Sequence, residues 1–167
     1  PAQVRVLDYG MGWGYWCQAA RAEGFDVSGF ELSAQRCEHA RGLGVNVIER
    51  FDENATAFDF IYANQVFEHL PDPLTTLREL VRLLRDDGLV YLRVPDGRGI
   101  AARLRQQGWD ASMDAVHPLE HINCFTRTTL TALAANAGLR PAPAPWRIHW
   151  RKPLGSLRRE IADRWFT

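Results

Sequence analysis

Short apolar runs alternate with stretches of helical periodicity along most of the chain, so strands and helices are expected to follow one another. Strands are predicted over residues 6–9, 25–31, 45–49, 58–65 and 89–95. Helices are predicted over residues 17–23 and 34–43, and over a third segment that Pro71-Asp72-Pro73 opens and Asp86-Asp87-Gly88 ends. This alternation predicts an α/β domain with a doubly wound, mostly parallel sheet of about six or seven strands.

The pattern is less regular toward the C-terminal end. Ser33 and Thr126 are suitable N-caps for the helices that follow them, and Gly138 is a suitable end for the second of these. The remaining predictions are a short helix over residues 100–107, a sixth strand over 146–150 and a last helix over 154–165. No segment is assigned to a seventh strand.

Composition and charge are those of an ordinary globular protein. At 167 residues, 46% of them hydrophobic, the chain is long enough for a single domain over residues 1–167. The formal net charge is zero, so no nucleic acid is expected as an obligate partner. The three cysteines have no metal-ligand spacing and predict a cytoplasmic protein with reduced thiols, and no apolar run reaches the length of a membrane span. Because the chain begins with Pro1 rather than Met, we expect a fragment that lacks its native N-terminus.

Three alternating glycines, Gly10, Gly12 and Gly14, stand between the first predicted strand and the first predicted helix. In parallel sheets this arrangement brings backbone N–H groups and a helix N-terminus to a small ligand. Glycines allow a positive φ and let the ligand lie against the main chain. Asp8, just before the turn, suits a positively charged ligand group. Glu31, at the end of the second predicted strand, can accept hydrogen bonds from both hydroxyls of a ribose.

A dinucleotide is the first alternative ligand for such a turn. The dinucleotide pattern is G-x-G-x-x-G, whereas the spacing here is G-x-G-x-G, and the bulky Tyr15 occupies the position of the third glycine. Asp8 would also repel a pyrophosphate. Both features disfavour an NAD-dependent oxidoreductase.

The stretch Leu7-Asp8-Tyr9-Gly10-Met11-Gly12-Trp13-Gly14 resembles the first motif of class I S-adenosylmethionine-dependent methyltransferases. Later stretches are similar to further motifs of that family in the same order: 29–33, 58–61 with 66–70, 83–89, and 117–126. The last is similar to a segment of the branch that acts mostly on small molecules, lipids and sugars. The resemblance covers about residues 4 to 140. It implies a Rossmann-like sheet, S-adenosyl-L-methionine as the cofactor and S-adenosyl-L-homocysteine as the product.

The resemblance also implies a role for each matching position. Gly10, Gly12 and Gly14 would approach the methionine part of the cofactor, Asp8 would lie near its ammonium group, and Glu31 would bind the ribose hydroxyls. The other positions assigned to the cofactor are Tyr9, Leu32, Phe51, Asp52, Asn64, Gln65 and Val66. Among them, Leu32 would pack on the adenine, Phe51 and Asp52 would contact it, and residues 64–66 would lie where the methyl donor faces its acceptor.

Glutamates and histidines in the loops that follow the strands are the candidates for catalysis: Glu68, His69, His117, Glu120 and His121. A base is needed only where the acceptor must lose a proton. We assign His121, with Glu120 beside it, as the base or as the residue that orients the acceptor. The alternative is that His121 is bonded to backbone and pins the loop. His69 is interpreted as fixing its turn, and no metal site is predicted.

The sequence therefore predicts a methyltransferase that uses S-adenosylmethionine on a small-molecule acceptor, at oxygen or carbon rather than at protein nitrogen. The loop over residues 96–119 is long and is expected to contact that acceptor. A non-catalytic S-adenosylmethionine-binding module of a larger protein or complex is the alternative from a different functional class. The acceptor and the oligomeric state are left open by the sequence.

Overall fold

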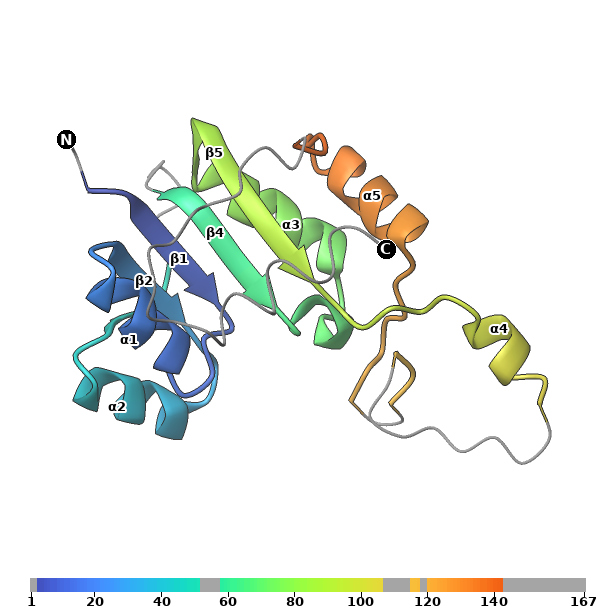
Figure 1. The fold of residues 1–167 in the computed structure, drawn as a ribbon, viewed down its shortest axis with the longest axis horizontal. Coiled ribbons are helices and arrows are strands. Elements are labelled where there is room, and N and C mark those ends of the chain that lie inside the picture. The colour runs from blue at the N-terminus through green and yellow to red at the C-terminus, as the bar shows by residue number, and fades with distance from the viewer. Residues whose placement is uncertain (1–2, 52–57, 107–114, 118–119, 143–167) are drawn as a thin grey trace.

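The computed structural model describes residues 3–51, 58–106, 115–117 and 120–142. The strands are β1 (Arg5–Tyr9), β2 (Asp26–Phe30), β3 (Asn46–Ile48), β4 (Phe58–Asn64) and β5 (Leu84–Arg93). The helices are α1 (Tyr15–Ala22), α2 (Ala34–Gly42), α3 (Pro73–Arg82), α4 (Ile100–Arg103) and α5 (Arg127–Asn136), with a 3₁₀ turn, η1 (Phe67–His69), between β4 and α3 (Figure 1). The predicted α/β class is confirmed. The strand and helix predicted over residues 146–165 lie outside the described residues.

The strands form one sheet with the order β3-β2-β1-β4-β5, and its pairings are parallel. The chain moves outward from β1 to β3 and then returns, so that β4 lies on the other side of β1. Open parallel sheets bind their ligands at the carboxyl ends of the strands beside such a reversal of strand order. The segments that follow β1 and β4 therefore meet where a ligand is expected.

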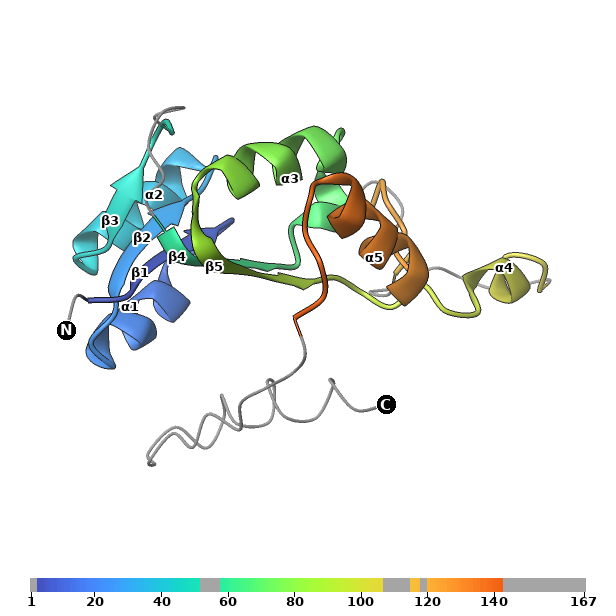
Figure 2. The same ribbon diagram turned by 90° about the horizontal axis from the view of Figure 1, so that it is seen from above.

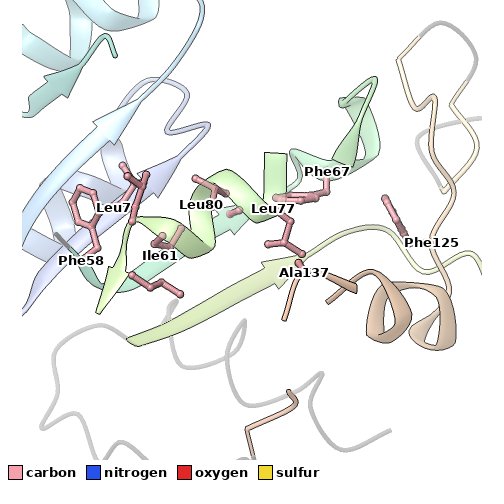
Figure 3. Packing of buried hydrophobic residues seen from close by; sticks show 11 residues of the cluster. Leu7, Phe58, Ile61, Phe67, Leu77, Leu80, Phe125 and Ala137 are labelled. Carbon is pink, nitrogen blue, oxygen red and sulfur yellow. The ribbon is translucent and has the colours of Figure 1, made fainter. Parts of the chain in front are cut away.

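Apolar side chains cover both faces of this sheet. On one face, Leu77 of α3 packs with Leu7 and Ile61 of the central strands (Figure 3). On the other face, Cys17 of α1 packs with Val6 of β1. Figure 2 shows α1 and α3 on opposite sides of the sheet. Burial on both faces explains why the central strands carry apolar residues at successive positions rather than at alternate ones.

Polar side chains fix the points at which three helices begin. The Ser33 hydroxyl accepts a backbone N–H from the first turn of α2, and the Asp72 carboxylate does the same for α3. Thr126 and Thr129 bond to each other's backbone N–H groups and form a capping box at α5. The predicted caps at Ser33 and Thr126 are confirmed.

The prediction for the end of the third helix is wrong. Strand β5 already begins at Leu84, so Asp86-Asp87-Gly88 lies inside a strand instead of terminating a helix. Phe58 of β4 pairs with Leu84, whereas Phe60 pairs with Leu89, so the intervening polar residues bulge out of the ladder. An Asp-Asp-Gly sequence is compatible with a helix end or with a β-bulge, and only the pairing with β4 distinguishes the two.

Helix α4 stands away from the sheet in both views (Figures 1 and 2). It lies in the loop that the sequence assigns to the acceptor, of which residues 107–114 and 118–119 are outside the described residues. Within the described part of the chain, none of the helices combines the length and the apolar character needed to cross a membrane.

Candidate active site

The turn between β1 and α1 uses the backbone freedom of its glycines. Gly10, Gly12 and Gly14 have φ values of +78°, +57° and +80°, which L side chains rarely adopt. The N–H groups of Gly10 and Met11 donate to the carbonyl oxygen of Phe30 at 2.8 and 3.0 Å. These bonds fasten the turn to the end of β2, so the backbone at the reversal of strand order is held in place.

The surroundings of Gly10 and Gly12 differ. A Cβ atom on Gly10 would overlap Cγ2 of Val66, whereas one on Gly12 would meet no atom of the described residues within 4 Å. The close contact between Gly10 and Val66 joins the glycine turn to the segment after β4. The open space at Gly12 lets a ligand lie against the main chain.

Glu31 follows β2 and is tied to the glycine turn. Its Oε2 accepts the N–H of Gly12 at 3.1 Å, and its Oε1 accepts the N–H groups of Leu32 and Ser33 at 2.9 and 3.0 Å. The guanidinium of Arg36 lies 3.7 Å from Oε2. The carboxylate is therefore oriented before any ligand binds. The sequence predicted Glu31 as a ribose ligand but did not reveal its bond to Gly12.

An open cleft of about 310 Å³ lies beside Glu31. It is lined by Phe30, Glu31, Leu32, Ala34, Cys37, Arg41 and Glu49. Leu32 is 85% exposed, which is unusual for a large apolar side chain at the rim of a cleft. A flat apolar group packed on it would bury this surface, as predicted for adenine. That contact stays a prediction.

Asp8 lies at the end of β1 and is only 3% exposed. The thiol of Cys17, in α1, donates to Asp8 Oδ2 across 3.3 Å. Burial raises the pKa of Asp8 to about 7; the thiol hydrogen bond opposes this change and the charge of Glu31 adds to it. Burial and the neighbouring Asp8 also raise the pKa of the Cys17 thiol, so it remains a donor. The sequence suggested only packing for Cys17, because nothing local pairs a helix thiol with a strand carboxylate.

Two other predicted cofactor residues belong to an aromatic group. The ring of Phe30 stacks on Tyr9 with centroids 5.1 Å apart and lies 4.9 Å from Phe51. Burial raises the pKa of Tyr9, the charge of Glu79 adds to the change and a hydrogen bond with Thr76 opposes it. The phenol of Tyr9 therefore points toward α3, and its contact with the cofactor stays a prediction. Asp52 lies outside the described residues.

The turn after β4 has strained backbone geometry. Gln65 has a φ of +58°, the single positive value at a non-glycine position among the described residues. Its N–H donates to the carbonyl of Arg93 at 2.8 Å, and the side chain of Arg93 donates to Asn64 Oδ1 at 3.5 Å. Such strain clusters at ligand sites. Val66 of this turn lies against Gly10, and the contact of Asn64, Gln65 and Val66 with the cofactor stays a prediction.

Histidines gather around η1, which follows the carboxyl end of β4. The ring of His121 lies 4.9 Å from that of His69 and 5.7 Å from that of His117. Nδ1 of His69 is 2.7 Å from the carbonyl oxygen of Glu120, so His69 ties its turn to the later segment. The Glu120 carboxylate faces His117, with Oε2 and Nδ1 3.6 Å apart. The two predicted catalytic residues, His121 and Glu120, therefore lie together in one cluster.

Glu68, in η1, is the buried member of this cluster. It is 1% exposed, and within the described part of the chain neither of its carboxylate oxygens has a hydrogen-bond partner. Burial raises the pKa of Glu68, and the positive charges of His69 and His121 oppose the change. The N–H of Asn123 donates to the Glu68 carbonyl at 3.0 Å, and the Asn123 amide donates to two carbonyls in and just after η1 at 3.4 and 2.6 Å. Glu68 is buried because this distant segment docks on it, which the sequence does not indicate.

The chain matches the family model described as a methyltransferase domain over residues 1–143. The ubiquinone biosynthesis O-methyltransferase of Xanthomonas axonopodis pv. citri (strain 306) is 29% identical over 162 residues, covering 84% of this chain and 64% of the relative. That of Actinobacillus pleuropneumoniae serotype 5b (strain L20) is 33% identical over 102 residues, covering 52% and 44%. The crystal structure of an S-adenosylmethionine dependent methyltransferase from Mesorhizobium loti has a TM-score of 0.51 and 24% identity, covering 57% of this chain and 49% of that one.

The parallel sheet, the glycine turn and the acid after β2 define a Rossmann-like domain of the class I methyltransferase type. Because the family model matches most of its residues, the chain belongs to the methyltransferase-domain family. The resemblance found in the sequence motifs is thereby confirmed. The chain spans only 44% and 64% of the lengths of the two relatives named above.

Alanine substitutions in the turn should separate folding from ligand binding. Both Gly10→Ala and Gly12→Ala place an L residue at positive φ, a cost of roughly 1–2 kcal/mol. Gly10→Ala adds the clash with Val66 and is expected to lower the melting temperature further. Gly12→Ala is expected to lower the melting temperature less than Gly10→Ala does, and to weaken the binding of S-adenosylhomocysteine. Thermal unfolding and calorimetry check both, with Gly10→Ala/Val66→Ala as the rescue. Equal melting temperatures for the two single variants would contradict the assignment.

Proposed function

We propose that this chain is the S-adenosylmethionine-binding catalytic domain of a methyltransferase that acts on a hydroxyl group of a small molecule. The observation that carries the proposal is the bond between the Glu31 carboxylate and the Gly12 N–H. This bond supports the proposal because it holds a carboxylate, a group suited to accept ribose hydroxyls, beside backbone that is open to a ligand. The names of the relatives, ubiquinone biosynthesis O-methyltransferases, support oxygen as the methyl acceptor.

The residues at the site fit S-adenosylmethionine part by part. The open side of Gly12 admits the methionine chain, and Asp8 offers a negative charge to its ammonium group. Glu31 is oriented for the ribose hydroxyls, and Leu32 presents apolar surface to the adenine. When bound, this cofactor would supply a methyl carbon activated by its attachment to a positively charged sulfur.

The chain itself would contribute alignment and proton removal. The glycine turn and residues 64–66 meet at the Gly10–Val66 contact and would fix the donor relative to the acceptor. A hydroxyl must lose its proton as its oxygen is alkylated, so a base increases the rate. We propose His121, with Glu120 beside it, as the base or as the group that orients the acceptor.

Two measurements test the function. Calorimetry should show binding of S-adenosylmethionine and S-adenosylhomocysteine and none of NAD. Methyl-labelled S-adenosylmethionine should then label small phenols in preference to amines or carbon acids. Tight cofactor binding with no labelled product from any acceptor would favour the non-catalytic module instead. Binding of NAD alone would overturn both readings.

We further propose that residues 1–167 form one cofactor-binding domain that works in the cytoplasm. Within the described residues the cysteines form no disulfide; Cys17 and Cys37 are buried and Cys124 is exposed. Free thiols are usual in a reducing compartment. The formal net charge of zero gives no reason to add a nucleic acid to the small-molecule acceptor as a partner.

A further inference from the structure

Glu68 has a carboxylate in surroundings that disfavour a negative charge. It is 1% exposed, and neither of its side-chain oxygens accepts a hydrogen bond from any residue that the structure describes. An ionised carboxylate in such a place is costly unless a positive charge lies close by. Buried polar groups are nearly always bonded, so one that is not calls for a functional explanation.

The groups that face Glu68 are imidazoles. A carboxylate oxygen of Glu68 and one ring nitrogen each of His69 and His121 all lie within 4.8 Å of one another. His69 has one ring nitrogen engaged with the Glu120 carbonyl at 2.7 Å. Among the described residues, His117 and Glu120 also lie beside His121, and they pair with each other at 3.6 Å. Glu68 is therefore the buried carboxylate beside the proposed base.

We propose that Glu68 is a positioning residue that stabilises the imidazolium formed when His121 takes the proton of the acceptor hydroxyl. This inference rests on the proposed methyl transfer to oxygen. The hydroxyl proton moves to a ring nitrogen of His121 as the oxygen gains its methyl group, and the imidazolium then releases it to water. An ionised Glu68 carboxylate makes His121 the stronger proton acceptor, and the imidazolium in turn favours the ionised form of Glu68.

Glu120 is less suited to this role although it adjoins His121 in the sequence. Its side chain is 61% exposed, so water screens its charge, whereas Glu68 acts from a dry position. Asn123 holds the segment that carries His121 onto the turn that carries Glu68, which fixes their separation. The pair is thus built from two segments that are distant in the sequence.

Nuclear magnetic resonance of the whole chain with S-adenosylhomocysteine bound tests the pairing without any acceptor. In Glu68→Gln the His121 ring signals should titrate at lower pH than in the wild type, by about one pH unit. Glu120→Gln should move this titration less, and Glu23→Gln, an exposed acid at the end of α1, should not move it. An unchanged His121 titration in Glu68→Gln would overturn the inference even if methyl transfer is demonstrated.

Steady-state kinetics with an acceptor that the enzyme methylates provide the second test. In the pH profile of kcat, Glu68→Gln should lower the plateau about tenfold and move the acid limb to lower pH. KM should change little. Glu68→Asp should recover part of the rate. The melting temperature of Glu68→Gln at pH 8 should not fall, because a buried charge is removed. A large fall with no change in the pH profile would show a structural role instead. Loss of activity on chelation, restored by a divalent cation alone, would also overturn the pairing.

Discussion

Replacing Glu31 by glutamine is expected to weaken S-adenosylhomocysteine binding by about 100-fold or more. Two ribose hydroxyls that donate to a carboxylate contribute about 1.5–3 kcal/mol each, and a neutral amide retains little of that contribution. The amide would also turn a donor toward the N–H groups of Gly12 or Leu32, which now donate to the carboxylate. Isothermal titration calorimetry of Glu31→Gln, with the exposed Glu38→Gln on α2 as the matched control, measures the loss.

Because Glu31 both holds the glycine turn and faces the ribose, the measurement must separate the two effects. An S-adenosylhomocysteine analogue without the ribose hydroxyls provides the separation in a double-mutant-type cycle. The wild type should bind the analogue weakly, and Glu31→Gln should bind it with nearly the same affinity as the wild type. If the substitution weakens both ligands by the same factor, the role of Glu31 is confined to the turn.

The sequence predicts those parts of the site whose backbone conformation is determined by residues that are neighbours in the chain. Gly10 and Gly12 need positive φ because they stand between a strand and a helix, and the strand-end position of Glu31 follows from the same alternation. The caps Ser33 and Thr126 are likewise local. Local pattern and tertiary structure agree at these points.

The parts that the sequence does not predict depend on contacts between distant segments. The bulge over Asp86-Asp87-Gly88 exists because Phe58 and Phe60 pair with residues five positions apart, Leu84 and Leu89. The thiol of Cys17 reaches Asp8 only because α1 packs on β1. Glu68 is interpreted from sequence as a loop residue, and only the docking of Asn123 shows that it is buried. A one-dimensional pattern indicates periodicity and caps but not which segments cover one another.

The affinity for S-adenosylhomocysteine is expected to rise about tenfold between pH 6 and pH 8. Burial raises the pKa of Asp8 to about 7, so its carboxyl is mostly neutral at pH 6 and mostly ionised at pH 8. Only the ionised form attracts the ligand's ammonium group. Calorimetry across this range checks the slope, and Asp8→Asn should bind weakly with no such slope.

The same carboxyl should affect the stability of the free protein in the opposite direction. Its folded pKa, about 7, lies above the ordinary value of 3.8, so the folded chain holds the proton more tightly than the unfolded chain does. The contribution of Asp8 to the free energy of unfolding therefore falls as pH rises from about 4 to 7 and stays low above that. Asp8→Asn should remove this loss and unfold at a higher temperature than the wild type at pH 8. A variant that is more stable but binds more weakly is the signature of a charge kept for a ligand.

Two comparisons decide whether the ammonium group is what Asp8 recognises. Methylthioadenosine lacks the amino acid part of S-adenosylhomocysteine, so its affinity should be flat between pH 6 and pH 8. Cys17→Ala removes the hydrogen bond that lowers the pKa of Asp8, so the rise in S-adenosylhomocysteine affinity should move to higher pH. If methylthioadenosine showed the same slope, a group other than the ammonium would be responsible. The acid before the turn would then be a structural partner of Cys17, and the positive charge of the ligand would have to be met elsewhere in the site.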